Sequence, residues 1–386
     1  YLAWAYLKYH WVKTLILVLS IGLVLFIPLG LNRLVNQSAQ QLTARASNTP
    51  LIVGTRGSAT DLTLTALYFK TPTFEPLQYK EYSGLIENAH HAIPLHARYQ
   101  ARGFGIIGTT LSYFEHRRLQ IDKGRSFTML GECVIGSEVA QNTSFKLGET
   151  VITTPAGAFD VAGSFPLKMK IVGVLKPSGT PDDQVIFTDL KTSWLIAGLA
   201  HGHQDVVTGP DTLVLSSTDS SVVANAAVLS YTEVTPENLD SFHFHGEVGQ
   251  YPIDAVMVIP ESRRENIQLR GRFEERTDNV QMIVPRTIID DLVNTMFTVK
   301  DSIIAAAIVI GMATAVIVGL VFWLSIKLRR KEIETMKTMG GAKGTINTIL
   351  GMEIGSILVV SLLLAVGFTL IFGELALSWI ENWITG

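Results

Sequence analysis

The side chains best suited to chemistry in this sequence are four histidines, arranged in two pairs with one residue between the members of each pair. The pairs are His201 with His203 and His243 with His245. Side chains at positions i and i+2 of a strand point to the same face, and imidazole is a common ligand of zinc and copper. Neither pair has a cysteine or carboxylate at ligand spacing. We therefore predict no metal site, and a metal centre on these four histidines stays as an alternative.

No catalytic or nucleotide-binding motif accompanies the histidines. Two glycine-rich stretches, GTRGSAT from Gly54 and GGAKGT from Gly340, lack the lysine followed by serine or threonine that a phosphate-binding loop requires. The sequence also lacks H-E-x-x-H, G-x-S-x-G and G-x-G-x-x-G. We expect no enzymatic activity and no cofactor on this chain, and a membrane-bound enzyme is an interpretation that no catalytic residues support.

A charged stretch at 329–339 is a stronger functional signal. Its charges alternate with Ile333, Met336 and Met339, whose spacing of three places them on one face of a helix. Gly340 and Gly341 then end the helix, as glycine does in a left-handed C-cap. A short helix with an apolar ridge needs a groove to receive it, and adaptable methionines favour a protein partner. The alternative is a solvated hairpin loop whose apolar stripe faces the membrane.

Long uncharged runs must position this stretch. One run precedes it (303–326), one follows it (354–373), and a third lies near the N-terminus (14–32). At about 1.5 Å rise per residue, each is long enough to cross a hydrocarbon core of roughly 30 Å as a helix. We expect transmembrane helices at 14–34, 301–327 and 346–375. The alternative for the first is a cleaved signal peptide, because basic residues precede it, although the run is long for that purpose.

Composition agrees with a membrane protein that also has a sizeable soluble part. Of 386 residues, 47% are hydrophobic and 17% charged, and the mean hydropathy is +0.31. The net charge of −3 gives no reason to expect nucleic-acid binding. Cys133 is the single cysteine, so an intrachain disulfide is impossible and the soluble part must depend on an ordinary hydrophobic core.

The positions of lysine and arginine predict the orientation of the chain in the membrane. Basic residues flank the first span within 1–13 and crowd the loop at 328–345. Because cytoplasmic loops carry an excess of such residues, both segments are expected in the cytoplasm or at its interface. The large segment 35–300 and the tail 376–386 then lie on the outer side.

The outer segment is predicted to be a mixed α and β domain. Short β-rich runs bounded by turn residues indicate strands, and we expect helices at 220–229, 261–271 and 285–299. The last helix carries Ile288, Leu292 and Met296 at i, i+4 spacing and leads into the second span. These three residues are predicted to form a stalk that passes movement between membrane and domain, and simple core packing is the alternative.

Glu353 is the most notable ionisable residue near the membrane, at the edge of the third span. A carboxylate there is expected to pair with the basic loop or with the positive end of the helix dipole.

Two groups of residues resemble one known family. The stretch RRKEIETMKTMGGAKGTINTILGMEI (329–354) is similar to the FtsX-type permease signature, in which this segment is the coupling helix that sits in a cleft of a separate ABC ATPase. GECVIGSEVAQNTSFKLGETVITTP (131–155) and MKIVGVLKPSGTPDDQVIFTDL (169–190) resemble the MacB-like periplasmic core domain. The matching coupling-helix residues are Arg330, Lys331, Glu332, Ile333, Met336, Lys337, Met339, Gly340, Gly341 and Ala342, and Glu353 opens the next membrane helix.

The resemblance implies a domain plan. It places a porter-like lobe at 35–130 and 233–284 around a β-rich inserted lobe at 131–232, followed by a stalk helix at 285–300. The fold class is thus an α-helical transmembrane part with a large mixed α/β periplasmic domain. The family normally has a fourth transmembrane helix, which would follow Gly386.

The resemblance also implies a function. A MacB/FtsX-like type VII ABC transporter permease in the bacterial inner membrane works as a homodimer with a cytoplasmic ATPase dimer, which holds the ATP and Mg. The process, called mechanotransmission, moves the periplasmic domains to export or extract a lipid, lipoprotein, peptide or drug. Membrane lipids and a periplasmic adaptor or carrier protein are further expected partners. The alternative is a membrane-anchored periplasmic binding or sensing protein, responsive to metal through the paired histidines.

Overall fold

The computed structural model describes residues 2–87, 90–154, 166–202, 214–218, 221–224, 232–338 and 343–385. The chain divides into two compact units, which we describe separately. The helical unit consists of Tyr1–Ala44 and Asp290–Glu381, and the sheet unit consists of Arg45–Ile289 with the end of the chain from Asn382.

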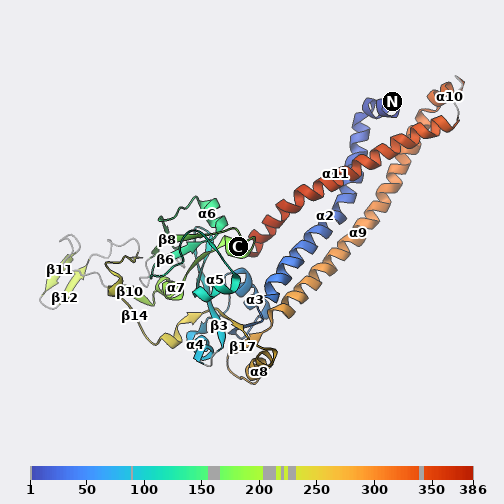
Figure 1. The fold of residues 1–386 in the computed structure, drawn as a ribbon. Helices are drawn as coiled ribbons and strands as arrows, with labels where there is room; N and C mark the ends of the chain where they lie inside the picture. Colours follow the sequence, from blue (N-terminus) through green and yellow to red (C-terminus); the bar gives the residue numbers. More distant parts are fainter. Residues whose placement is uncertain are drawn as a thin grey trace. The chain divides into compact units, whose positions relative to one another are not determined.

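Helices of the helical unit include three that are long enough and apolar enough to cross a membrane (Figure 1). The predicted transmembrane part with three spans is therefore confirmed. The candidate spans are Trp11–Ser47, Pro285–Leu328 and Asn347–Ile371. The helices are α1 (Leu2–Tyr9), α2 (Trp11–Ser47), α9 (Pro285–Leu328), α10 (Arg330–Thr338) and α11 (Lys343–Thr385).

The long helices exceed what a bilayer requires. α2 has 37 residues and α9 has 44, whereas about 20 residues cross the hydrocarbon core. One unbroken α9 contains both the predicted stalk at 285–300 and the predicted span at 301–327. α11 continues to Thr385 and so includes most of the predicted tail at 376–386.

Apolar packing joins the three long helices. Leu17 and Val18 of α2 and Ile357 of α11 are buried together, with Phe322 of α9 packed against them. Gly22 of α2 allows this close approach, because a Cβ there would lie 3.0 Å from a side-chain carbon of α11. Most other apolar side chains on these helices are exposed, as side chains that face lipid are.

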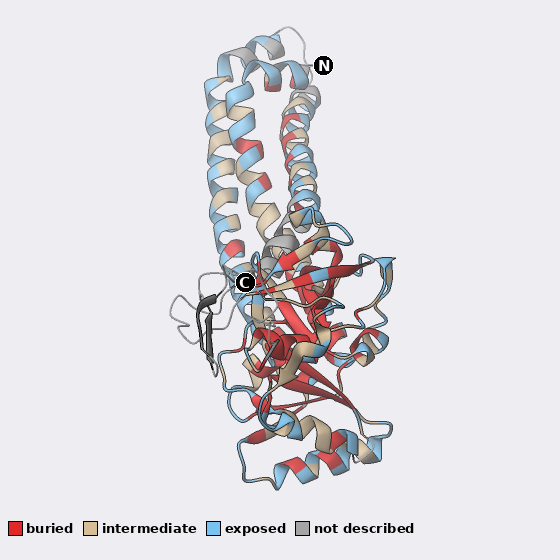
Figure 2. Cartoon of the chain, turned by 90° about the vertical axis from the view of Figure 1, so that its left-hand side faces the viewer, coloured by how far each residue is buried: buried red, intermediate tan, exposed pale blue. Residues whose placement is uncertain are grey.

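An eleven-stranded sheet forms the centre of the described part of the sheet unit, and buried residues are concentrated along its strands (Figure 2). The strand order is β13-β8-β6-β9-β4-β3-β16-β1-β17, and β5 and β7 also pair with β8. The mixed α/β fold class is confirmed. The strands are β1 (Leu51–Thr55), β3 (His91–Ala101), β4 (Phe104–Thr109), β5 (Ile121–Gly124), β6 (Glu132–Ile135), β7 (Thr150–Ile152), β8 (Leu167–Leu175), β9 (Ile186–Asp189), β13 (Thr232–Glu233), β16 (Ala255–Ile259) and β17 (Val280–Ile283).

Strand β3 joins two halves of this sheet. Its first part pairs with β16, its second part pairs with β4, and the β3–β4 register shifts between His96 and Tyr99. We call the strands β16, β1 and β17 the near half, and β4, β9, β6 and β8 the far half. Asp254 is fully buried beside the shift, where it accepts hydrogen bonds from the Ala97 N–H (2.7 Å) and from Arg98 Nε (2.7 Å).

Two apolar cores lie against the sheet. One includes Val53, Val256 and Phe273, and the other includes Ile171 and Cys133, which is fully buried. Helices that complete the sheet unit are α3 (Ala59–Tyr68), α4 (Tyr79–Glu87), α5 (Leu111–Arg117), α6 (Ser137–Thr143), α7 (Leu190–Ile196) and α8 (Arg263–Glu274). Short 3-10 turns are η1 (Pro181–Gln184), η3 (Leu239–Ser241) and η4 (Val248–Gln250), and small strand pairs are β10 (Ala200–Gly202) with β14 (Phe242–Phe244), β11 (Val214–Thr218) with β12 (Ser221–Ala224), and β15 (Pro252–Ile253) with β2 (Leu77–Gln78).

One predicted helix is wrong where the structure describes it. The range 220–229 was expected to be helical, but β12 occupies Ser221–Ala224 and pairs with β11. Val222 and Val223 are β-branched residues, which favour a strand when a partner strand is available. The predicted helices at 261–271 and 285–299 are confirmed by α8 and α9.

Gly136 provides a test of how tightly the far half packs against the η1 turn. A Cβ at this position would lie 2.2 Å from the backbone oxygen of Asp183. We expect Gly136→Ala to destabilise the sheet unit by about 1–3 kcal/mol, the usual cost of overpacking, in thermal unfolding of the purified chain. Gly84→Ala is the control, because a Cβ at that helical glycine meets open space. Equal stability of the two variants would show that the turn is free to shift.

Candidate functional site

The loop between the second and third spans contains α10, separated from α9 by Arg329 alone. Arg330 Nε lies 3.2 Å from Glu334 Oε1, an i, i+4 ion pair of the kind that supports short helices. Ile333 is half-buried, and Thr335 is exposed. The chain therefore presents a nine-residue helix between two candidate membrane spans.

The structure describes the ten predicted coupling-helix residues to different extents. Three are described in full, three are described through their backbone in α10, and four lie outside the described residues. Contact of these residues with an ATPase stays a prediction. In that order, they are Arg330, Lys331 and Ile333; Glu332, Met336 and Lys337; and Met339, Gly340, Gly341 and Ala342.

A polar cluster holds the residue that precedes α10. Arg329 Nη1 lies 3.1 Å from each carboxylate oxygen of Glu353, which is buried on α11. The Arg329 guanidinium also lies over the ring of Tyr6, 3.7 Å from its centroid. Ser325 Oγ lies 3.1 Å from Tyr6 Oη and accepts a hydrogen bond from Lys13 Nζ at 2.6 Å.

The cluster joins four helices at one point. Its residues come from α1, α2, α9 and α11, and Arg329 stands between α9 and α10. A buried charge is costly to separate from its partner, so Arg329 and Glu353 resist being pulled apart. The cluster therefore connects Arg329 to α11 through Glu353 and to α1 through Tyr6, and it connects α9 to α2 through Ser325 and Lys13.

The predicted stalk residues flank the buried face of α9. Ile288, Leu292 and Met296 are each half-buried, whereas the neighbouring Ile289 and Val293 are buried. The most buried face of the helix thus lies one position further along the chain than the predicted stripe. The role of these residues in passing movement stays a prediction.

The paired histidines come together in part. His201 in β10 is the register partner of His243 in β14, and the rings of His243 and His245 lie with centroids 4.5 Å apart. Within the described residues, no group of three or more histidine, cysteine or acidic side chains could hold a metal ion. His203 lies outside the described residues.

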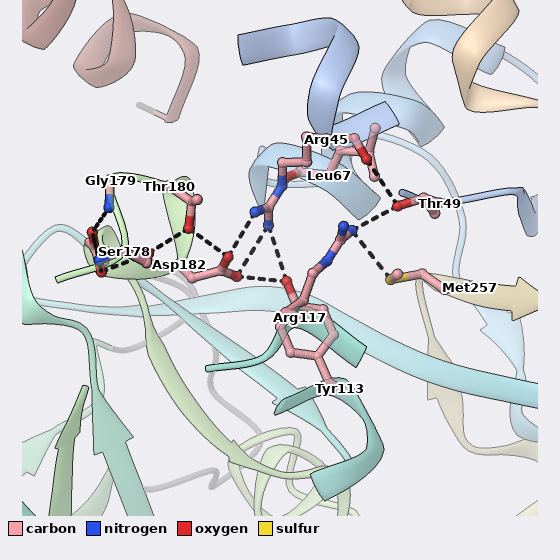
Figure 3. A network of polar contacts seen from close by, with 11 residues as sticks. Arg45, Thr49, Leu67, Tyr113, Arg117, Ser178, Gly179, Thr180, Asp182 and Met257 are labelled. Carbon is pink, nitrogen blue, oxygen red and sulfur yellow. Dashed lines mark hydrogen bonds and ion pairs between the residues drawn. The ribbon is translucent and has the colours of Figure 1, made fainter. Parts of the chain in front are cut away.

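A second polar network, which no motif predicted, lies in the sheet unit where α2 ends (Figure 3). Arg45 is buried in the last turn of α2 and pairs with Asp182 in the η1 turn. The pair is bidentate: Nη1 donates to Oδ2 at 2.7 Å, and Nη2 donates to Oδ1 at 3.1 Å. Arg45 Nη2 also donates to Tyr113 Oη at 3.1 Å, and Nε donates to the Leu67 carbonyl.

The Asp182 carboxylate is saturated with hydrogen bonds. Besides those from Arg45, it accepts one from Tyr113 Oη at 2.6 Å and one from Thr180 Oγ1 at 2.8 Å. The neighbouring Asp183 accepts hydrogen bonds from the backbone N–H groups of Ser178 and Gly179 and so holds the turn in place. The carboxylate of Asp182 is therefore preorganised to receive the guanidinium.

Electrostatics keep this pair charged. Burial by itself would raise the pKa of Asp182, but the charge and hydrogen bonds of Arg45, with those of Tyr113 and Thr180, lower the pKa to about 2. Burial opposes the charge of Arg45 as well, yet the attraction of Asp182 raises its pKa. Burial, and next the charge of Asp182, raise the pKa of Tyr113, so its hydroxyl stays protonated and donates.

Helix α5 extends the network to the residues that follow α2. His116 Nε2 lies 2.9 Å from the Asn48 carbonyl oxygen, and Arg117 Nη2 donates to Thr49 Oγ1 at 2.8 Å. Burial lowers the pKa of Arg117, whose Nε is buried without a hydrogen-bond partner in the described part of the chain. On the other side, Arg286 in the first turn of α9 donates to Ser47 Oγ.

The sequence contained only weak signals for this network. Arg45 is one basic residue among polar ones, and Asp182 lies in a stretch that resembles the family domain without being marked as functional. Their separation of 137 residues hides the pair from any local pattern. Arg329 and Glu353, 24 residues apart across one loop, were easier to connect.

Residues 14–235 match the family model of the MacB-like periplasmic core domain. The match covers more than half of the 386 residues. The chain belongs to this family. It is a MacB/FtsX-like ABC transporter permease, a transmembrane protein with a periplasmic domain. Arg45, Tyr113 and Asp182 of the permease lie within the matched segment, whereas α9, α10 and α11 lie beyond it.

Two solved structures are similar to part of the permease. The periplasmic region of MacB from Actinobacillus actinomycetemcomitans is 10% identical with a TM-score of 0.37, and the match covers 66% of this chain and 98% of that chain. The extracellular domain of the noncanonic ABC-type transporter YknZ from Gram-positive bacteria is 12% identical with a TM-score of 0.32, and the match covers 60% of this chain and 98% of that chain. A search of the curated proteins found no match.

The pKa of Asp182 leads to a prediction for acid stability. Because folding lowers this pKa from an ordinary 3.8 to about 2, the stabilisation is complete above the ordinary pKa and is lost as the pH falls toward 2. The unfolding free energy of the permease should fall between about pH 5 and pH 2. We expect this fall to be about 2 kcal/mol smaller in Asp182→Asn than in the unaltered permease. Near-ultraviolet circular dichroism during denaturant titration measures the unfolding free energy at each pH.

The matched control for this measurement is Asp240→Asn, which changes an exposed aspartate. It should keep the pH dependence of the unaltered permease. A pH dependence in Asp182→Asn as steep as in the control would contradict the lowered pKa of Asp182.

Proposed function

We propose that this permease works by mechanotransmission. In this proposal, a separate cytoplasmic ABC ATPase dimer hydrolyses ATP with Mg and moves α10, and the movement reaches the periplasmic domain of a permease homodimer. Permeases of this family work with a cytoplasmic ABC ATPase, which supports that kind of partner. The bacterial inner membrane is the corresponding location.

The Arg329–Glu353 ion pair is the observation that carries the proposal. A flexible loop would absorb a push from a partner, but Arg329 directly precedes α10 and is held to α11 by two hydrogen bonds. The same arginine stacks on Tyr6, so the start of α10 cannot move alone. These contacts suit a helix that must pass its displacement to the membrane spans.

The length of α9 supports the next step of the proposal. One helix of 44 residues contains the candidate span and is separated from β17 of the sheet by one residue. A continuous helix transmits translation and rotation along its axis better than a segmented connection does. The substrate is proposed only as a class, a lipid, lipoprotein, peptide or drug that the periplasmic domain exports or extracts.

A pair of variants on α10 tests the ATPase contact. We expect Ile333→Asp to abolish co-purification of the co-expressed ATPase, because a carboxylate buried in an apolar contact costs several kcal/mol. Thr335→Asp introduces the same charge about 200° around the helix and is the matched control. Both variants should keep the thermal stability of the permease itself. Retention of the ATPase by both variants would contradict the assignment of α10 as the coupling helix.

A further inference from the structure

The covalent connections of α2 and α9 both lead to the near half of the sheet. α2 is followed by β1 after three residues, and α9 follows β17, with β1 and β17 paired side by side. Movement carried along these helices by the backbone alone would therefore arrive in the near half. The register shift in β3 stands between that half and the far half.

The Arg45–Asp182 pair connects α2 to the far half instead. Asp182 lies in η1, between β8 and β9. Strand β9 pairs with β4 and β6, and β8 pairs with β6, so a displacement of the turn acts on the strands of that half. Gly136, which follows β6, packs closely on the backbone of the same turn, since a Cβ there would lie 2.2 Å from the Asp183 carbonyl oxygen.

The chemistry of the pair suits a connection that fixes geometry. A buried ion pair is a poor way to gain stability, because desolvation of the charges offsets most of their attraction. A bidentate guanidinium–carboxylate contact, however, is planar and directional, so it fixes the position of one partner relative to the other. Apolar packing at the same place would allow a helix to slide or rotate against the domain.

The surroundings hold both partners in position. Tyr113 bonds to both Arg45 and Asp182, Thr180 fixes the carboxylate from the other side, and the Leu67 carbonyl fixes Nε of the guanidinium. His116 and Arg117 hold the next residues of the chain, so the end of α2 is gripped over several successive positions.

We propose that Arg45 and Asp182 are positioning residues that make the far half of the sheet follow α2, so that movement of the membrane helix reaches both halves of the periplasmic domain together. This inference rests on the proposed mechanotransmission. Without the pair, the near half still follows the helices through β1 and β17. The far half is then left with the contacts of His116 and Arg117 to residues 48 and 49 and with the shifted register of β3, so it follows α2 less closely.

The test uses the complete permease reconstituted with its ATPase and compares spin-label distances between the two permease copies with and without ATP. One label replaces Lys123 on β5, which pairs with β8 of the far half. The other replaces Gln268 on α8, which packs beside β17 of the near half. Both positions are exposed, and the native Cys133 is buried.

The decisive variant is Arg45→Met with Asp182→Leu. Removing both charges together leaves no uncompensated charge in the core. The variant also loses the hydrogen bonds to Tyr113 and to the Leu67 carbonyl, so we expect a modest loss of thermal stability, and the distances are compared at a temperature at which both proteins are folded. We expect the ATP-dependent shift at position 268 to persist and the shift at position 123 to become clearly smaller, because the contacts of His116 and Arg117 remain. Lys168→Met with Glu233→Gln is the control, because it removes an ion pair within the far half that does not involve α2. It should keep both shifts.

The outcomes separate the two proposals. Shifts at both positions in Arg45→Met with Asp182→Leu, equal to those of the unaltered permease, overturn the role of the pair and leave mechanotransmission standing. Absence of any ATP-dependent shift at either position in the unaltered permease overturns mechanotransmission, and this role of the pair with it. Loss of the shift at position 123 in the Lys168→Met, Glu233→Gln control also contradicts the specific role of Arg45.

Discussion

A charged side chain is costly to bury unless an opposite charge or several hydrogen bonds compensate it, and this constraint governs the two polar sites of the permease. In the helical unit, Glu353 on α11 is buried because Arg329 reaches it across the loop. In the sheet unit, Arg45 is buried because the η1 turn presents Asp182. Each pair joins segments that are not neighbours in the chain, so each one specifies an arrangement that apolar packing would leave adjustable.

Helix α2 makes polar contacts near both of its ends. Near its start, Lys13 bonds to Ser325 beside the Arg329 cluster, and in its last turn Arg45 enters the network of the sheet unit. Between them lies a single helix of 37 residues. The first span was predicted only as a transmembrane helix, and the polar contacts near its two ends are the observations on which its proposed role in coupling rests.

The sheet shows why the predicted lobes need not behave as separate bodies. Strands β6, β8 and β9 come from the predicted insertion at 131–232, yet β9 pairs directly with β4 from the flanking segment. Buried Asp254 secures the place where β3 changes partners, because it bonds to the backbone of Ala97 and to Arg98. Continuity of the hydrogen-bonded ladder permits transmission between the halves, and the register shift in β3 is the place where it can fail.

The sequence by itself determined the features that depend on composition and short-range pattern. Uncharged runs specify membrane helices because hydrocarbon excludes unpaired polar groups. The periodic spacing of Ile333 and Met336 predicted a helix, and both residues lie in α10. The family was also recognisable from the sequence, because the segments that resemble it are continuous stretches of the chain. The strand β12 was missed because its partner strand, rather than local propensity, decides its conformation.

Only the tertiary structure decided the contacts between distant residues. Arg45 meets Asp182 because the chain between them forms much of the sheet, and no local spacing encodes a separation of 137 residues. The burial of Arg45, and with it the pKa shifts of the pair, exists only once that core has formed. The sequence therefore specified the elements and the family, while long-range packing decided which charges are buried and which parts of the chain they join.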